Sequence, residues 1–204
     1  MSAAFDEMGG DNGASPRAAY TELSRWLKEV PPDVLDYRRR EAELVFRRIG
    51  ITFAVYGEAD AQERLIPFDV IPRILAADEW KLVQTGLAQR VKALNLFIKD
   101  IYGDREILKA GVIPDDLIFR NAAFRPEMSG LKVPHDIYVQ IAGIDIVRVD
   151  ADTFYVLEDN VRTPSGVSYM LENREIMLRL FPELFARHRG DLRLALRELY
   201  DRSS

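Results

Sequence analysis

The sequence predicts an α+β fold, in which helices surround a β-sheet that contains an antiparallel hairpin. Two observations carry this prediction. Apolar side chains recur at steps of three and four through residues 78–102, as they do on one face of a helix. Two segments rich in Ile, Val, Phe and Tyr, 137–149 and 153–159, flank the polar turn Asp150–Thr153, as in a β-hairpin. Helical patterns on both sides of the hairpin complete the layout.

The other elements follow from helix start and stop signals and from β-branched runs. Ser15-Pro16 is typical of a helix start, and Pro67 and Pro72 exclude a helix over residues 63–75. In chain order, the sequence predicts a disordered lead (1–15), a helix from Pro16 that ends before Pro31, a helix over 33–49 that stops at Gly50, a strand over 51–56, an extended irregular segment (63–75), the long helix 78–102, short helices over 104–110 and 114–120, a loop (121–136), the hairpin, and helices over 167–188 and 190–202.

The apolar stripe of the long helix is predicted to be core. It includes Trp80, Val83, Leu87 and Ile101, which lie on one side of a helix at these spacings. We therefore expect the residues of this stripe to be buried.

Composition narrows the functional classes. The chain has 204 residues, of which 48% are hydrophobic, enough for a packed core, and a formal net charge of −5. This balance gives no case for nucleic-acid binding. The absence of cysteine excludes disulfides and Cys-ligated metals. The sequence has no signal-peptide start and no apolar run of about 18 residues, so we expect a cytoplasmic protein with no membrane or nucleic-acid partner.

The hairpin brings polar side chains together near its open end. If Val149 lies opposite Phe154, then Asp145 lies opposite Glu158. Because side chains alternate between the two faces of a strand, these two carboxylates and Asn160 would share one face. A register shift of one residue would move Asp145 to the other face.

This face is a candidate metal site. Directly opposed carboxylates repel each other and destabilise the strand pair. A hairpin tolerates this repulsion if a cation lies between the carboxylates or if the face is open to water. Mg²⁺ binds carboxylate and amide oxygens, usually together with phosphates. The metal ligands predicted on this basis are Asp145, Glu158 and Asn160, and a solvated strand edge without metal is the alternative.

Two further segments contain candidate contacts to a cofactor. Ser165 and Gly166 follow Pro164 at the predicted start of a helix, where a small residue permits close backbone approach and an anion can bind. Many helices begin this way without a ligand. Arg64 and Arg73 lie in the proline-rich run, which either packs or presents these side chains to phosphate or substrate.

Four segments of the chain resemble the circularly permuted ATP-grasp proteins related to glutathionylspermidine synthetase. They are ERLIPFDVIPRIL, EWKLVQTGLAQRVKALNLFIKDIYG, GIDIVR and VLEDNVRTPSGVSYMLENR, within about residues 50–185. The resemblance implies ATP-dependent ligation, in which a carboxylate is phosphorylated by ATP and an amine attacks the acyl phosphate to give an amide. It also implies Mg²⁺ and ATP as cofactors, and small-molecule or peptide carboxylates and amines as substrates.

Motif position in this family implies roles for particular residues. The implied Mg²⁺ ligands are again Asp145, Glu158 and Asn160, with Asp150 as the second choice because an Arg-x-Asp pattern occurs in related synthetases. Arg148 and Arg162 become candidates for catalytic contacts with phosphate, acyl phosphate or carboxylate. The alternative for Arg148, which the predicted register aims at the opposite face, is a surface arginine whose stem covers apolar area.

Family members are longer than this chain, and the lobe that encloses the adenine follows the segment present here. We therefore expect residues 16–204 to be the N-terminal portion of a permuted ATP-grasp domain, incomplete and inactive or weakly active by itself. We therefore also expect it to associate either with a complementing chain or with further copies of itself as a homo-oligomer. A non-catalytic binding or assembly module derived from this fold and a purely structural remnant are the alternatives.

Overall fold

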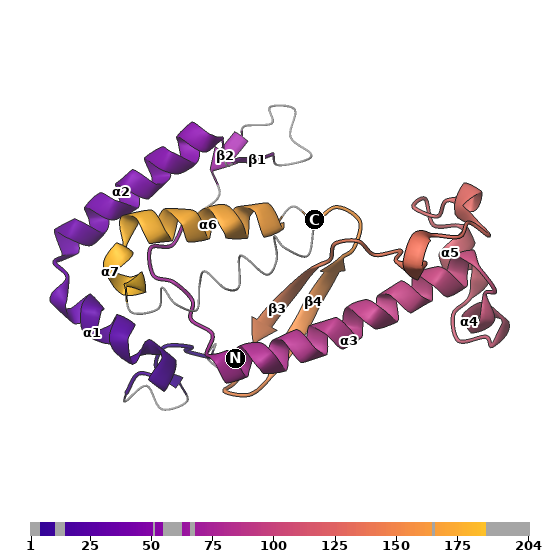
Figure 1. The fold of residues 1–204 in the computed structure, drawn as a ribbon, viewed down its shortest axis with the longest axis horizontal. Helices are drawn as coiled ribbons and strands as arrows, with labels where there is room; N and C mark the ends of the chain where they lie inside the picture. The colour runs from indigo at the N-terminus through magenta and orange to yellow at the C-terminus, as the bar shows by residue number, and fades with distance from the viewer. Residues whose placement is uncertain are drawn as a thin grey trace. The chain divides into compact units, whose positions relative to one another are not determined.

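The computed structural model describes residues 5–10, 15–50, 52–54, 63–65, 68–164 and 166–186 (Figure 1). The chain divides into two compact units, one formed by residues 1–75 with 165–204 and the other by residues 76–164. Helices and two small antiparallel sheets make up the described elements, which confirms the α+β class. Among the described helices, none has the length and apolar composition needed to cross a bilayer.

The first unit is mostly helical. Pro32 occupies the first position of its longest helix, where its missing N–H costs no hydrogen bond, and Gly50 ends that helix with a φ of +76°. Its elements in chain order are the 3₁₀ turn η2 (Ala18–Tyr20), α1 (Thr21–Glu29), α2 (Pro32–Ile49), β1 (Thr52–Ala54), β2 (Glu63–Leu65), α6 (Gly166–Leu180) and α7 (Pro182–Phe185).

The core of this unit joins segments that lie far apart in the sequence. One buried cluster combines Ala42 and Phe46 of α2 with Ile176 of α6. A second contains Phe181, which is completely buried and packs edge-on against Trp26 with ring centroids 5.5 Å apart. Packing of α6 and Phe181 against α1 and α2 therefore joins segments from both parts of this unit in its core.

Three predictions for this unit differ from the structure. The first helix begins at Thr21, because residues 15–20 are taken up by a connection to residues 5–10 and by the turn η2. The predicted helix over 167–188 is interrupted at Phe181, since Pro182 has no N–H and instead starts the separate helix α7. The irregular segment 63–75 contains the short strand β2, which pairs with β1.

Other predictions for this unit fall largely outside the described residues. The helix over 190–202 lies there entirely, and so do residues 1–4 and 11–14 of the predicted disordered lead. Residues 5–10 carry a turn in which Gly10 N–H donates to the Asp6 carbonyl, 2.7 Å away. The disordered lead stays a prediction.

The second unit is organised along one long helix. The β-hairpin lies along the first half of α3, and the short helices α4 and α5 lie at its C-terminal end (Figure 1). The elements in chain order are α3 (Ala77–Tyr102), α4 (Glu106–Lys109), α5 (Asp115–Phe119), the 3₁₀ turns η3 (Pro126–Met128) and η4 (Pro134–Asp136), β3 (Gly143–Arg148) and β4 (Phe154–Asn160).

The stripe on α3 is less buried than predicted. Val83 and Ile101 are buried, but Trp80 is 52% exposed. A two-stranded sheet is narrow, and in the described part of this unit it covers only part of the stripe. The prediction that Trp80 belongs to the core is therefore wrong in this structure.

The first strand of the hairpin is shorter than the predicted 137–149. It begins at Gly143 because Asn95 of α3 binds the segment before it. The Asn95 Oδ1 accepts the N–H groups of Tyr138, 2.8 Å away, and Val139, 3.0 Å away, while its Nδ2 donates to the Asp136 carbonyl at 2.9 Å. These N–H groups bond to a helix side chain, so they do not enter a strand ladder.

We predict that Phe181→Ala lowers the free energy of unfolding of the first unit by about 3–5 kcal/mol, because it leaves a cavity against Trp26. The measurement is urea unfolding followed by Trp26 fluorescence in a Trp80→Phe background, which removes the other tryptophan of the chain. Leu171→Ala is the control, since Leu171 is 42% exposed on α6 and its loss should cost about 0.5 kcal/mol or less. Equal losses for the two variants would contradict this core.

Candidate functional site

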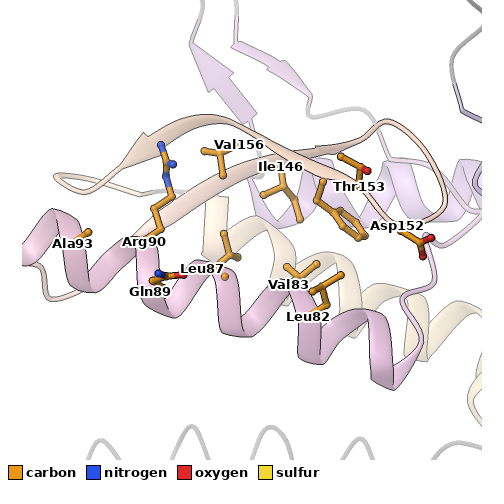
Figure 2. A pocket seen from close by; sticks show the side chains of 12 residues that line it. Leu82, Val83, Leu87, Gln89, Arg90, Ala93, Ile146, Asp152, Thr153 and Val156 are labelled. Carbon is orange, nitrogen blue, oxygen red and sulfur yellow. The ribbon is translucent and has the colours of Figure 1, made fainter.

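The hairpin covers α3 with an apolar inner face. Ile146 of β3 and Val156 of β4 lie over Val83 and Leu87 of the helix (Figure 2). An open groove of about 620 Å³ remains between the two elements, with Arg90 among its lining residues. The inner face of the hairpin is thus defined by its contact with α3, and the other face points away from the helix.

A β-bulge changes the register halfway along the hairpin. At the open end Asp145 pairs with Glu158, as predicted, but at the turn end Phe154 pairs with Arg148 and not with the predicted Val149. Leu157 is the extra residue that separates the two registers. The predicted register is therefore correct at the candidate site and wrong by one residue at the turn.

The bulge decides which side chains face outward. Leu157 and Glu158 are consecutive residues and both are exposed, whereas Asp159 is half-buried toward α3. Asp145 and Asn160 are exposed as well, and Asn160 Nδ2 donates to Glu158 Oε1 at 2.8 Å. The structure brings the three predicted metal ligands together on the outer face.

Their electrostatics fit a cation. A hydrogen bond with Glu158 raises the pKa of the Asp145 carboxyl, and desolvation and the Glu158 charge act in the same direction. Two carboxylates that stabilise a shared proton can also be neutralised by a divalent ion. In the described part of the chain no three His, Cys, Asp or Glu side chains gather at metal-ligating distances, so the third protein donor would be the Asn160 amide oxygen.

Arg148 lies on the inner face, opposite the three candidate ligands. It is buried, and its Nη2 pairs with Glu79 Oε1 at 2.7 Å. Its Nε donates to the Asp150 carbonyl at 2.9 Å, and its guanidinium lies 5.0 Å from the ring centroid of Phe154. These contacts exclude the surface arginine considered from the sequence and tie the turn to the start of α3.

Asp150 acts as a turn residue. Its Oδ1 accepts the N–H groups of Asp152 and Thr153, both at 2.8 Å. The hydrogen bond from Asp152 is the main reason that the pKa of Asp150 is lowered. This geometry occupies the carboxylate at the turn, away from the Asp145–Glu158 pair.

The segment after β4 folds against the base of the hairpin. A Cβ atom on Gly143 would lie only 2.8 Å from Cβ of Pro164. Gly143 therefore permits Pro164 to approach the strand pair next to Asn160, and the exposed Arg162 lies within this segment. This role of Gly143 is not among the sequence predictions, although an isolated glycine in a strand signals a close approach.

The candidate cofactor contacts belong to the first unit. Ser165 lies outside the described residues, as does the side chain of Arg64, whose backbone is part of β2. Gly166 begins α6, and among the described residues, apart from its chain neighbours and its own helix, no heavy atom lies within 4 Å of the place where its Cβ would be. Arg73 pairs with Glu7 through Nε–Oε2 at 3.0 Å and Nη2–Oε1 at 2.5 Å. Their predicted role in cofactor binding stays a prediction.

Comparison with known proteins gives a consistent result. A family model described as a circularly permuted ATP-grasp matches residues 72–195. An uncharacterised protein of Synechocystis is 41% identical over 170 residues, which are 83% of this chain and 35% of that protein. An uncharacterised protein of Mycobacterium leprae is 44% identical over 190 residues, or 92% of this chain and 33% of that protein.

A third relative carries an enzyme name. A Frankia alni protein named "Putative glutamate--cysteine ligase 2-3" is 42% identical over 185 residues, which are 89% of this chain and 21% of that protein. The chain thus spans about a third of the length of the two uncharacterised relatives and about a fifth of the Frankia protein.

We predict that Gly143→Ala displaces Pro164 from the hairpin, because the added methyl group occupies the position of the proline ring. The expected cost is about 1–3 kcal/mol of stability, together with faster amide hydrogen exchange in residues 161–163. Gly86→Ala is the matched control: apart from its own helix, its Cβ meets no atom of the described residues within 4 Å, so the helix should gain up to about 1 kcal/mol. Unchanged exchange in Gly143→Ala would show that the close approach is absent in solution.

Proposed function

The chain belongs to the circularly permuted ATP-grasp family, and from this premise we propose that it supplies the metal-binding part of an ATP-dependent carboxylate–amine ligase. The observation that carries the proposal is the outer face of the hairpin, where Asp145, Glu158 and Asn160 lie together. The ligase name of the Frankia relative supports amide formation as the reaction class.

The three side chains suit Mg²⁺ by their chemistry. Asp145 and Glu158 provide carboxylate oxygens, and Asn160 provides an amide oxygen, all of which are hard donors. Because Asn160 Nδ2 donates to Glu158, its Oδ1 is the atom left to accept a cation. Bound Mg²⁺ would supply neutralisation of the charge on the phosphates of ATP.

The two arginine candidates separate on geometry. Arg162 is exposed two residues after Asn160, in the segment that Pro164 holds against the hairpin. A guanidinium there suits a phosphate, acyl phosphate or carboxylate group next to the metal. Arg148 is engaged by Glu79 on the inner face, which favours a structural role for it. We therefore propose Arg162 as the catalytic arginine.

The substrates follow from the reaction class. The proposal requires ATP, a small-molecule or peptide carboxylate, and an amine. A non-catalytic binding module built on the same face would bind Mg²⁺ and ATP but form no amide. Hydroxylamine traps an acyl phosphate as a hydroxamate. A hydroxamate formed from the chain, MgATP, candidate acids and hydroxylamine would therefore exclude the non-catalytic module, whereas the incomplete chain by itself is expected to form little.

We predict that Glu158→Gln weakens the binding of Mg²⁺, and the binding of ATP in the presence of Mg²⁺, by about tenfold or more. The reason is that the substitution keeps the shape of the side chain but removes a carboxylate that faces Asp145. Loss of a residue that only supports a metal ligand already lowers metal affinity by about tenfold. Titration calorimetry of the chain with Mg²⁺, and then with MgATP, measures the effect.

Glu127→Gln is the control, because Glu127 is an exposed acid of the second unit outside the hairpin. It should leave both affinities unchanged. Absence of heat and of thermal stabilisation with millimolar Mg²⁺ and MgATP for the unsubstituted chain would overturn the metal assignment. An unchanged affinity in Glu158→Gln would remove Glu158 from the site.

A further inference from the structure

Asp159 lies between two candidate metal ligands but points away from them, toward α3. Its carboxylate accepts two hydrogen bonds from Arg90, Nε–Oδ1 at 2.7 Å and Nη2–Oδ2 at 2.6 Å. We propose that Asp159 is a positioning residue: by occupying Arg90 it prevents this arginine from capturing Glu158, and so keeps Glu158 on the outer face. The consequence for metal binding rests on the proposed function.

The hairpin has a second register available to it. Continued without the bulge, the turn-end register would place Glu158 opposite Ile144, the position that Asp159 occupies in the structure. Alternation along the strand would then point Glu158 toward α3 and Asp159 outward. With the bulge at Leu157, Glu158 points outward. Without the bulge, Glu158 would point inward.

Arg90 could donate hydrogen bonds to the carboxylate of either Asp159 or Glu158. Its guanidinium extends from α3 toward the hairpin (Figure 2), and a fork of N–H donors binds the carboxylate of Asp or of Glu. The competing register would also relieve the repulsion between Asp145 and Glu158, because Asp145 would lie opposite Leu157. Asp159 is the carboxylate that pairs with Arg90 in the bulged register and so offsets this cost.

Charge also separates the two faces. Both oxygens of the Asp159 carboxylate lie within hydrogen-bond distance of the Arg90 guanidinium on the inner face. The Asp159 side chain is 18% exposed, so the pair is partly shielded from water. A neutral residue at this position would leave Glu158 as the nearest carboxylate of the strand that can reach Arg90.

The test is Asp159→Asn, which keeps the size of the side chain and removes its charge. We expect Glu158 to turn toward Arg90, so that cross-strand nuclear Overhauser effects link Asp145 with Leu157 in place of Glu158. Mg²⁺ affinity should fall by about tenfold or more, within the range for loss of a supporting contact, although Asp159 is not a proposed ligand.

A second substitution should reverse the effect. In Asp159→Asn with Arg90→Gln, the cation that attracts Glu158 is gone, and an inward Glu158 carboxylate would lose water without gaining this partner. That loss should outweigh the repulsion from Asp145 on the water-exposed outer face, so the bulged register and the Mg²⁺ affinity should both return. Asp159→Glu keeps a carboxylate for Arg90 and should retain the bulged register. Asp152→Asn, a loss of the same charge at the exposed turn, is the control and should change neither quantity.

The outcomes separate the two proposals. If Asp159→Asn keeps Asp145 opposite Glu158, or if the unsubstituted chain binds Mg²⁺ and the double variant binds it no better than the single one, the positioning role of Asp159 is wrong. If the unsubstituted chain binds no Mg²⁺, the proposed function fails, while the Overhauser effects still decide the register. A register change in Asp159→Asn that the double variant reverses would support the inference in either case.

Discussion

The double hydrogen bond between Arg90 and Asp159 is the contact on which the geometry of the candidate site depends. It joins α3 to the end of β4 and holds Asp159 on the inner face of that strand. Since neighbouring residues of a strand point to opposite faces, an inward Asp159 requires an outward Glu158 and an outward Asn160. The bulge at Leu157 makes this arrangement compatible with the apolar inner face nearer the turn.

The hairpin sorts its charges between two faces. On the inner face each carboxylate has an arginine, Asp159 with Arg90 at the open end and Glu79 with Arg148 at the turn end. On the outer face Asp145 and Glu158 oppose each other, and a hydrogen bond between them is the main reason that the pKa of Asp145 is raised. Folding therefore concentrates negative charge on the outer face, where the relationship to the ATP-grasp family leads us to propose Mg²⁺. The arginines Arg90 and Arg148 pair with other carboxylates on the inner face, so they do not neutralise Asp145 and Glu158.

Local patterns predicted most elements, and contacts between distant residues caused the errors in the second unit. The long helix and the stop at Gly50 follow from periodicity and backbone preference. Residues 137–142 have the composition of a strand, but Asn95, more than forty residues earlier, accepts the N–H groups of Tyr138 and Val139. Trp80 fits an apolar stripe, yet its exposure depends on how much of α3 the hairpin covers.

The sequence by itself determined the fold class, the hairpin and the identity of the three candidate ligands, because strand alternation and family motifs depend on local spacing. Tertiary structure decided the register over the length of the hairpin, the inward position of Arg148 and the close approach of Pro164 to Gly143. Each of these depends on which groups the hairpin meets. A bulge adds one residue without a change in composition, so only the packing of the strand against α3 and Arg90 reveals it.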